Sequence, residues 1–542
     1  MSNFLEILEP IGNDWYQITD NIDHYAMLLK KEPGVRYIPE KSLELHSSHL
    51  PLLPDFSCFV PQQSPPEVGK SFSKKWVASL WSWQVEGAED IRSRKGTLLC
   101  DGLGTGKTRT AIYAMDFPAV VVCPNSALQS VWGDELAEAG LRYKILEGRK
   151  FDESVFDDKD EIDVWVMPYS IIHRWLPFFS EAGYGPTIKT LVGDEAHELQ
   201  NRKGKPAQAW HSVNPDRVVI LTATPIRNRL KSLWSLLNAV APNSFGNFWD
   251  FRIAYCAATE GEYGLEDGIP SDITIRRLSS RLKQLVIKRS REDVGQIVVP
   301  HIREVYTVDT TATERLDTMQ GASNREINQL WFNAGAKLTG EQLAMKARMR
   351  QAFGLLKAEK GLELIHDCLG DWSRIVLWIW HKKVADFLKD ELKDMYDVDT
   401  ILGSTTKKKR REILKDWKYG DVKPKMPKIL IASIGALSSA VSLTACGCSI
   451  FVEQDWAPLH MIQAEKRTHR AGQRNDSCES LYLTIGYNTL DEKITKVLVE
   501  KTEEDERVFG SDGRGDQMRA ILGSAKTDSD AEFMRKILER MT

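Results

Sequence analysis

From Trp76 onward, short runs of β-branched and other apolar residues alternate with helix-length amphipathic segments. The runs are GTLLC, AVVVCP, VWVMP, LVGDEAH and VVILTATP, and each ends in turn-forming or polar residues. Strands that are buried on both faces read as nearly continuous apolar runs, and their alternation with helices is typical of a parallel sheet. The pattern therefore predicts an α/β fold in which helices wrap a parallel sheet.

A second series of the same kind follows an interruption. From about 231 to 296 the helical pattern LKSLWSLLNAVAP gives way to polar, less periodic sequence, which indicates a helical insertion and a linker. Beyond it, the strand-like runs REVYTV, RIVLWIW, DVDTILG, KILIAS and SIFVE alternate with helical segments such as KKVADFLKDELKDMY. This rhythm predicts a second lobe of the same architecture.

The two ends of the chain differ from these lobes. The stretch PLLPDFSCFVPQQSPPEVGK cannot continue a helix or a central strand, so it indicates a domain boundary. We expect a small N-terminal module over 1–70, a first lobe over 71–300 with its helical insertion at about 231–290, a second lobe over 301–510, and a linker with a C-terminal helix over 511–542.

Length and composition are consistent with this division. A chain of 542 residues exceeds what one hydrophobic core usually supports. With 42% hydrophobic and 27% charged residues, long disordered tracts are not expected. The net charge of -4 gives no global attraction to nucleic acid, so any such binding must come from local basic surfaces.

Cysteine spacing and hydropathy bear on the cellular compartment. None of the eight cysteines form a C-x-x-C pair, so we expect reduced, mostly buried thiols and no zinc site. The N-terminus lacks a signal-peptide pattern, and no apolar run is long enough to span a bilayer. We expect a monomeric cytoplasmic protein of a bacterial or virus-infected cell, with no membrane partner; a nuclear location is less favoured.

A glycine-rich turn provides the first candidate chemistry. The run GTLLC leads into residues 101–108, here called the phosphate loop, and then into a helix. Glycines let backbone N–H groups approach phosphates, a lysine neutralises the β and γ groups, and a threonine hydroxyl can hold magnesium. The candidate residues are Gly102, Gly104, Gly106, Lys107 and Thr108. Asp101 departs from the general pattern, which has glycine there, and a purely structural turn is the alternative.

A carboxylate pair follows the run LVGDEAH. Because ligands of open parallel sheets bind at the carboxyl ends of the strands, Asp194 and Glu195 are expected near the phosphate loop. Asp194 would complete the magnesium shell, and Glu195 would orient or deprotonate the water that attacks the γ-phosphate. An isolated acidic pair of this kind is more often a solvated strand end.

These motifs carry a family resemblance. Asp-Glu-Ala-His at 194–197 resembles the motif of the DEAH-box group within the superfamily-two helicases. The resemblance implies that Gln84 reads adenine, that Arg467 and Arg470 reach the γ-phosphate from the second lobe, and that both lobes have RecA-like folds. It assigns the coupling of hydrolysis to movement to His197, Thr222, Thr224 and Gln463.

A finer resemblance covers about residues 76–508. AVVVCPNSALQSVWGDEL, LTATPIRN, SFGNFWDF and THRAGQ resemble the Swi/Snf family of translocases, and SIGALSSAVSLTACGCSIFVEQDWAPLHMIQAEKRTHRAGQ resembles its annealing-helicase (HepA-related) subgroup. Members move on duplex DNA without ordinary unwinding. KKEPGVRYIPEKSLEL resembles the small DNA-binding module of that subgroup, although a Pro-Gly turn between two strands gives the same letters.

Candidate DNA contacts come from both lobes. They are Cys123, Pro124, Asn125, Tyr169, Ser170, Lys407, Arg410, Ser433 and Ser442, with Lys288, Arg289 and Arg291 of the inter-lobe linker as further candidates. For the basic run at 407–411, which begins a helix inside the second lobe, the interpretations are phosphate binding or a solvated helix face, with a nuclear-targeting signal as the competing label. Where the family has glycines in its fifth motif this chain has Ser438 and Ala440, which predicts modest DNA stimulation of the ATPase.

The sequence thus predicts an ATP- and magnesium-dependent double-stranded DNA translocase that couples hydrolysis to movement along duplex or forked DNA. Remodelling or annealing is expected in place of processive unwinding. Two alternatives stay open at this point. One is a strand-separating DNA or RNA helicase, and the other is an ATP-gated DNA clamp or assembly subunit with incidental hydrolysis.

Overall fold

The computed structural model divides the chain into two compact units, each described here by itself. Unit 1 comprises Met1–Gln296 with Glu504–Gly510, and unit 2 comprises Ile297–Glu503 with Ser511–Thr542. The structure describes 72–308 and 340–485 with short gaps (149, 181–182, 227–228, 262–263, 292, 296–298, 438–440, 456–457 and 471), parts of 8–46 (8–12, 15–18, 29, 32–33, 35–38 and 42–46), and 507–509.

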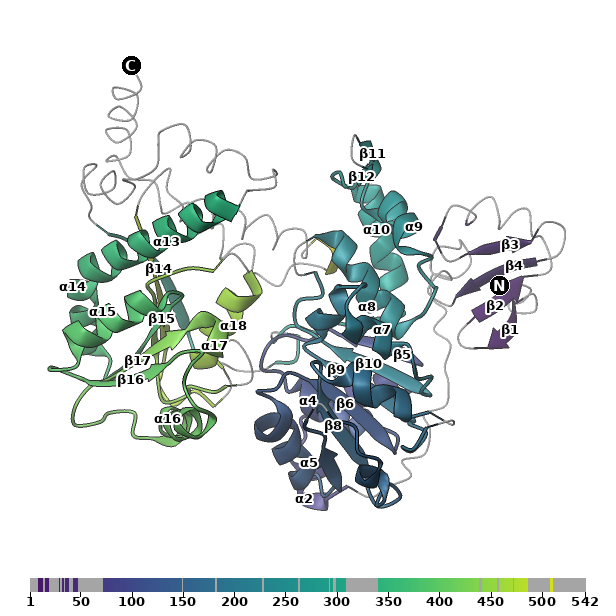
Figure 1. The fold of residues 1–542 in the computed structure, drawn as a ribbon, viewed down its shortest axis with the longest axis horizontal. Helices are drawn as coiled ribbons and strands as arrows, with labels where there is room; N and C mark the ends of the chain where they lie inside the picture. The colour runs from purple at the N-terminus through teal and green to yellow at the C-terminus, as the bar shows by residue number, and fades with distance from the viewer. Residues whose placement is uncertain are drawn as a thin grey trace. The chain divides into compact units, whose positions relative to one another are not determined.

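Unit 1 is built on a seven-stranded parallel sheet (Figure 1), as the apolar runs predict. The strand order is β13-β5-β10-β9-β6-β8-β7. The bounds are β5 Gly96–Leu99, β6 Ala119–Cys123, β7 Tyr143–Ile145, β8 Val164–Pro168, β9 Thr190–Asp194, β10 Arg217–Leu221 and β13 Val286–Ile287. The five runs identified from the sequence are the five central strands, and β7 and β13 are additional edge strands.

Two hydrophobic cores lie on the two faces of this sheet. Successive strand residues such as Val120 and Val121 belong to opposite cores, because side chains alternate along a strand. One core includes helices α2 (Lys74–Ala78), α3 (Ser82–Arg92), α4 (Lys107–Ala114) and α5 (Asp134–Glu138). The other includes α6 (Ile172–Trp175), α7 (Lys205–Trp210), α8 (Leu233–Val240), α9 (Phe248–Tyr255) and α10 (Asp272–Leu282).

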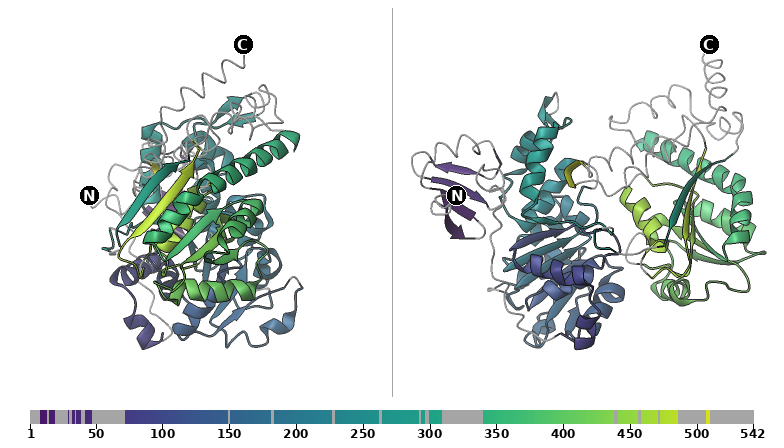
Figure 2. Two further views of the ribbon diagram at one scale, coloured as in Figure 1. Left: turned by 90° about the vertical axis from the view of Figure 1, so that its left-hand side faces the viewer. Right: turned by 180° about the vertical axis from the view of Figure 1, so that it is seen from behind.

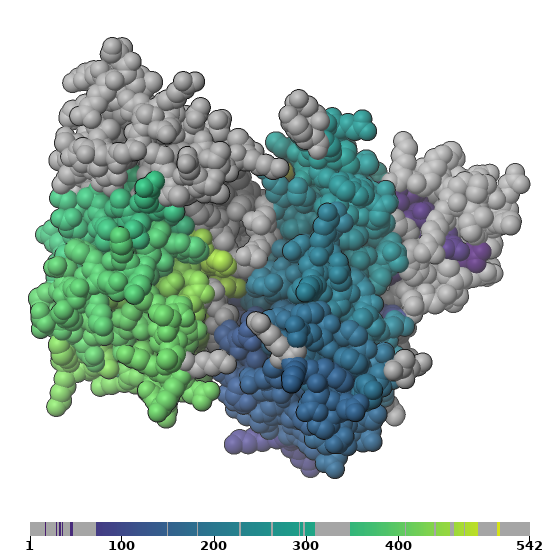
Figure 3. Space-filling model, in the orientation of Figure 1, coloured from purple at the N-terminus to yellow at the C-terminus, as the bar shows by residue number. Residues whose placement is uncertain are grey.

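The predicted helical insertion is present as α8, α9 and α10, with an exposed hairpin of β11 (Thr259–Gly261) and β12 (Gly264–Glu266). In the space-filling view this teal segment rises from the blue body of the unit (Figure 3). After α10 the chain returns to the sheet as β13, which pairs with β5 in parallel. The sequence pattern did not predict this strand.

The N-terminal segment forms a small antiparallel sheet, seen in purple in Figure 2. Its order is β1-β2-β4-β3, with β1 Leu8–Gly12, β2 Trp15–Ile18, β3 Arg36–Ile38 and β4 Ser42–His46. The buried Glu32 accepts hydrogen bonds from Tyr255 and Arg277, and the fully buried Arg281 donates to Pro33 O at 3.2 Å. This segment is therefore anchored on α9 and α10.

Unit 2 has a six-stranded parallel sheet, ordered β14-β19-β18-β15-β17-β16. Its strands are β14 His301–Thr307, β15 Arg374–Ile379, β16 Asp397–Ile401, β17 Lys428–Ser433, β18 Cys448–Phe451 and β19 Cys478–Thr484. The helices are α13 Gly340–Lys360, α14 Leu362–Asp371, α15 Lys382–Leu392, α16 Lys407–Tyr419, α17 Ile434–Leu437 and α18 Pro458–Thr468. The prediction of a second α/β lobe is confirmed.

A short segment beyond β19 in sequence, Glu504–Gly510, belongs to unit 1. Ser279 on α10 donates to Val508 O at 2.7 Å, and Arg507 forms an ion pair of 3.0 Å with Asp272. Val508 is buried in the core that includes α10. The predicted C-terminal helix lies outside the described residues.

Two further expectations concern thiols and membranes. Seven cysteines of the described part are free and buried, which confirms the expected burial. Among the helices that the structure describes, none combines the length and the hydropathy needed to cross a bilayer.

Candidate nucleotide site and motor residues

The candidate nucleotide residues of unit 1 meet at one edge of its sheet. The phosphate loop follows β5, the Asp194–Glu195 pair follows β9, and Thr222–Thr224 follows β10, which lies between the other two strands. The three strands are parallel, so their carboxyl ends share an edge. The topology therefore brings together three segments that are spread over residues 101–224 of the sequence.

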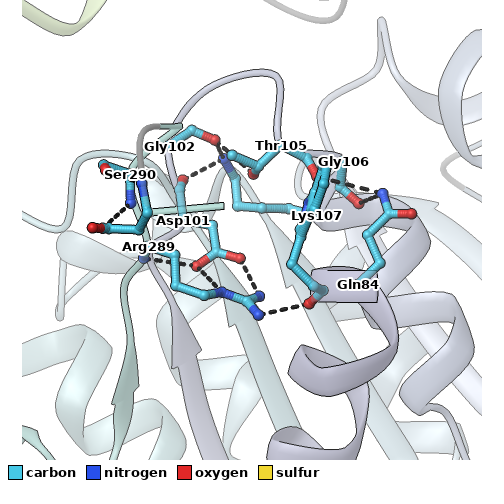
Figure 4. A network of polar contacts seen from close by, with 10 residues as sticks. Gln84, Asp101, Gly102, Thr105, Gly106, Lys107, Arg289 and Ser290 are labelled. Atoms are coloured by element: carbon cyan, nitrogen blue, oxygen red, sulfur yellow. Dashed lines mark hydrogen bonds and ion pairs between the residues drawn. The ribbon is translucent and has the colours of Figure 1, made fainter. Parts of the chain in front are cut away.

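The phosphate loop is closed around the ammonium group of Lys107. Lys107 Nζ donates to Asp101 O at 2.8 Å and to Gly102 O at 3.1 Å, as Figure 4 shows. Gly106 has φ +82° and precedes α4, a conformation that favours glycine. Burial lowers the pKa of Lys107, while Glu195, Asp101 and Asp194 oppose that shift. The ammonium thus donates to two neutral backbone oxygens and has three carboxylates nearby.

Gln84 lies against the loop and is fully buried. Its amide nitrogen donates to Thr105 O at 3.4 Å and to Gly106 O at 3.3 Å, and its Oε1 accepts from Trp81 N at 3.0 Å. Trp83 also donates to Thr105 O, at 3.1 Å. The structure therefore shows Gln84 supporting the loop, and its implied role toward adenine stays a prediction.

Asp194 sits at the end of β9, where its side chain accepts from Trp132 Nε1 at 2.9 Å. Burial raises the pKa of the Asp194 carboxyl, and the Trp132 hydrogen bond and the charge of Lys107 oppose that rise. Tyr169 donates to the backbone oxygen of Asp194 at 3.1 Å. Trp132 and Tyr169 therefore orient the carboxylate and its backbone, a role that the sequence did not indicate for Trp132.

Glu195 adopts a left-handed backbone conformation, with φ +48° and ψ +51°. Such a conformation is uncommon in a residue with a side chain and tends to occur at functional sites. The turn that follows, which carries His197, is tied to the next strand, because Gln200 Nε2 donates to Pro225 O at 2.9 Å. A link therefore joins the acidic turn to the Thr222–Pro225 segment.

Thr222 and Thr224 are buried at the end of β10. Thr222 N donates to Leu99 O at 3.1 Å, and Thr222 Oγ1 accepts from Thr224 N, also at 3.1 Å. Among the residues that the structure describes, Thr224 Oγ1 is buried with no hydrogen-bond partner. The segment is thus held directly beside the strand that leads into the phosphate loop.

The basic residues after β13 do not lie where the sequence analysis placed them. They were assigned to an inter-lobe linker as candidate DNA contacts, but β13 belongs to the sheet of unit 1. Arg289 forms an ion pair with Asp101 at 2.5 Å, and Arg291 donates to Leu103 O at 2.8 Å. Because β13 is parallel to β5, its carboxyl end reaches the phosphate loop.

The candidate DNA contacts of unit 1 differ in exposure. Asn125 and Ser170 are exposed and Pro124 is half-buried. Cys123 is fully buried at the end of β6, where burial raises the pKa of its thiol, and the Tyr169 ring is buried beneath Asp194. The side chains of Cys123 and Tyr169 are therefore not accessible to DNA. Any contact with DNA at this surface would come from Asn125 and Ser170.

In unit 2 the two arginines of α18 and the turn after it converge on one backbone oxygen. Arg467 Nη1 donates to Val441 O at 3.2 Å, and Arg470 Nη1 donates to the same oxygen at 3.1 Å. Burial lowers the pKa of Arg470. Gln463 is buried one turn earlier on the helix. The loop that contains Val441 therefore holds both arginines.

A buried carboxylate anchors this helix to the sheet of unit 2. Glu465 accepts from Arg303 at 2.6 and 3.0 Å and from the Tyr482 hydroxyl at 2.5 Å. Burial raises the pKa of Glu465, but the bonds and charge of Arg303 outweigh it, and the pKa falls to about 2. Because Arg303 is on β14 and Tyr482 is on β19, α18 is tied to two neighbouring strands.

The remaining candidates of unit 2 surround the loop after β17. Ser433 and Ser442 are half-buried. Arg410 donates to Ala436 O at 3.4 Å and to Leu402 O at 3.2 Å, so its guanidinium supports this loop and the turn before α16. Lys407 begins α16, and the Lys407 side chain and residues 438–440, with Ser438 and Ala440, lie outside what the structure describes.

Two protein-family models match this chain. The SNF2-related domain matches residues 70–352, more than half of the chain, and the helicase conserved C-terminal domain matches residues 357–472. The chain belongs to the SNF2-related family. Neither matching description names the DEAH-box group, so Asp-Glu-Ala-His at 194–197 remains a local likeness.

Individual relatives are distant, and this member of the SNF2-related family spans about half of their length. An uncharacterized ATP-dependent helicase of Mycoplasma pneumoniae is 25% identical over 80% of this chain and 42% of its own. SWI/SNF-related matrix-associated actin-dependent regulator of chromatin subfamily A-like protein 1 of Drosophila melanogaster is 24% identical over 88% and 61%. The DNA annealing helicase and endonuclease ZRANB3 of Bos taurus is 24% identical over 83% and 42%.

Among solved structures, the SWI2/SNF2 ATPase core of Sulfolobus solfataricus in complex with double-stranded DNA is 19% identical. The match covers 86% of this chain and 99% of that chain, with a TM-score of 0.38.

Proposed function

We propose that this SNF2-related chain is an ATP-dependent motor that translocates along duplex or forked DNA, and that it remodels or anneals DNA without processive unwinding. The observation that carries the proposal is the meeting of the phosphate loop, the Asp194–Glu195 turn and Thr222–Thr224 at one sheet edge. Relatives named as helicases, one of them a DNA annealing helicase, support the choice of DNA.

In this proposal the phosphates of ATP bind at the start of α4, where backbone N–H groups and the helix dipole favour anions. Lys107 exchanges Asp101 O and Gly102 O for phosphate oxygens. Phosphate charge also balances the cost of burying its ammonium group, which is what lowers the pKa of Lys107.

Thr108 and Asp194 fit a magnesium ion, because a hydroxyl and an oriented carboxylate at one edge are the oxygen ligands that this cation prefers. Magnesium bound there with ATP would neutralise charge on the phosphates. Trp132 keeps the Asp194 carboxylate oriented, and Glu195 orients or deprotonates the attacking water.

For Arg467 and Arg470 of unit 2 we propose a role toward the γ-phosphate during hydrolysis. A guanidinium that reaches the γ-phosphate only in a closed state stabilises charge that develops during transfer, so hydrolysis would require closure. Val441 O holds both arginines, and this loop lies in the region where the DNA contacts are predicted, which supports coupling between DNA and hydrolysis.

The test is steady-state ATP hydrolysis without nucleic acid and with blunt duplex, forked DNA, single-stranded DNA or RNA. The proposal predicts that duplex or forked DNA stimulates most. A preference for single strands or RNA would indicate a strand-separating helicase, and hydrolysis that no nucleic acid stimulates would indicate an ATP-gated clamp.

A further inference from the structure

Asp101 is a buried carboxylate at the first position of the phosphate loop. Its residue is 1% exposed, and glycine is the residue that the general pattern has there. A carboxylate removed from water requires charge-assisted hydrogen bonds to stay ionised. The substitution of aspartate for glycine therefore requires a specific cationic partner in the fold.

That partner is Arg289, which lies 188 positions later in the chain. Arg289 Nη2 donates to Asp101 Oδ2 at 2.5 Å, and Arg289 Nε and the Arg289 backbone N donate to Oδ1 at 3.2 and 3.0 Å. A forked guanidinium–carboxylate pair of this kind is strong and directional. Figure 4 shows the guanidinium aimed at the carboxylate.

The contacts around Arg289 extend to both sides of the nucleotide site. Its Nη1 donates to Trp83 O at 2.6 Å, next to Gln84 on α3. Gly87 on the same helix leaves room for the guanidinium, since a Cβ there would lie 2.4 Å from Arg289 Nη2. Arg289 thus links the phosphate loop to the helix that carries the predicted adenine-reading residue.

The backbone after β13 continues this link. Arg289 O accepts from Gly102 N at 2.8 Å, so the parallel pairing with β5 extends into the loop. Two residues later, Arg291 Nε donates to Leu103 O at 2.8 Å, and Arg291 is buried. Residues 289–291 therefore hold the phosphate loop by its first carboxylate and by its backbone, a few residues before unit 1 ends at Gln296.

We propose that Arg289 is a positioning residue for nucleotide binding, acting through Asp101, with Arg291 as its support. The pair fixes the shape of the phosphate loop before ATP arrives and makes nucleotide affinity dependent on the segment by which the chain leaves unit 1. The inference rests on the proposed ATPase function. It assigns Arg289 to nucleotide binding, whereas the sequence alone placed Arg289 among the candidate DNA contacts.

The decisive measurement is the dissociation constant of a fluorescent ATP analogue, taken without nucleic acid, for Arg289→Gln, Asp101→Asn and the double variant. Each single change leaves a buried charged or polar group without its partner, so each should weaken nucleotide binding by about ten-fold or more. Because the two groups act as one unit, the double variant should be no weaker than the weaker single variant.

Steady-state kinetics separates positioning from general damage. Arg289→Gln should raise KM for ATP more than it lowers kcat, and Arg289→Lys, which keeps the charge but loses the fork, should fall between Arg289→Gln and the unaltered chain. The matched control is Arg276→Gln, an exposed arginine of α10, which should bind nucleotide normally. If Arg289→Gln fails to fold, Arg289→Lys decides by the same measurement.

Unchanged nucleotide affinity in these variants, with weakened binding to duplex DNA, would overturn the inference and restore the DNA assignment. Additive losses in the double variant would also overturn it. Failure of the proposed function looks different, because in that case the unaltered chain itself would neither bind the analogue nor hydrolyse ATP.

Discussion

Lys107 is the residue on which binding and hydrolysis both depend in this account. Lys107 is half-buried as a residue, and burial lowers the pKa of its ammonium group. Lys107→Ala should reduce kcat by at least about 100-fold, as the loss of a group that stabilises transferring charge does. The unfolding temperature of Lys107→Ala should be no lower than that of the unaltered chain, because the variant no longer buries a cation.

Phosphate release in the presence of duplex DNA measures the effect of Lys107→Ala. Lys189→Ala, at an exposed position of the same unit, serves as the matched control and should be fully active. If Lys107→Ala retained its ATPase activity, the assignment of the phosphate loop would be wrong.

Trp132 gives a prediction about pH. Burial raises the pKa of Asp194 and the Trp132 hydrogen bond opposes the rise, so Trp132→Phe should raise that pKa further. Hydrolysis requires the ionised carboxylate, so the acid limb of the kcat/KM profile should move to higher pH by about one unit. Trp165→Phe, at a buried tryptophan on β8, which lies two strands from β9, should leave the limb in place. A limb that moved equally in both variants would contradict the role of Trp132.

The letters of the phosphate loop and of the acidic turn predicted which residues gather at the sheet edge, because parallel strands deliver their carboxyl ends to one place. They did not predict Arg289 or Trp132. These side chains arrive through long-range pairing and helix packing, which leave no local pattern. Asp101 carried the one available signal, since a carboxylate in an apolar context requires a cation.

The α18 helix, which carries Gln463 and Arg467, depends on Glu465 for its position. The pKa of Glu465 is depressed in the fold to about 2, so its ionised form contributes stability above pH 4.5 that is lost as the pH falls through 2. Glu465→Gln should therefore lower the free energy of unfolding by about 3 kcal/mol at pH 7, because Arg303 loses its charged partner.

Urea unfolding of both proteins between pH 7 and pH 2 tests this prediction. The difference between them should shrink below pH 4.5, where the unaltered chain begins to lose the same contribution. A constant difference over the whole range would show that the carboxylate charge is not what anchors α18.

The N-terminal segment makes a comparable contact on α9 and α10. Glu32→Gln would leave Arg281 fully buried without its carboxylate, at a cost of about 3 kcal/mol. Amide hydrogen exchange in β3 and β4 should then become faster, because the N-terminal sheet that contains these strands opens more often. Glu260→Gln, on the exposed hairpin, should change nothing there. Unchanged exchange in β3 and β4 after Glu32→Gln would contradict the anchoring.

Elements with strong apolar runs were predictable and weaker ones were not. The five central strands of unit 1 and the strands β15, β17 and β18 were identified because continuous burial leaves an unbroken apolar signature. The strands β14 and β16 were also identified, although they are only partly buried. The strands β7 and β13 have only three and two residues. They are strands because they pair with the neighbouring strands β8 and β5. The strand β19 was not identified, because polar residues such as Glu479 interrupt its apolar run.

The whole chain combines two α/β units with an acidic net charge of -4, so DNA binding must come from local basic surfaces. The sequence rhythm predicted the two lobes but not the return of 504–510 to unit 1, because a short segment docked on a distant helix has no periodicity of its own.

If the basic surfaces hold the phosphate backbone of DNA, the affinity for duplex DNA should fall steeply with salt and depend little on base sequence. A titration of labelled duplexes of different sequence at several salt concentrations measures both, and salt-insensitive binding would contradict this prediction.

The central claim is movement along duplex DNA driven by ATP, and displacement of a third strand from a triplex measures it most directly. The account predicts that the chain displaces the third strand when ATP is present and duplex DNA leads up to the triplex, and that Lys107→Ala does not. Displacement no greater than that of Lys107→Ala, in a protein that still hydrolyses ATP, would contradict translocation.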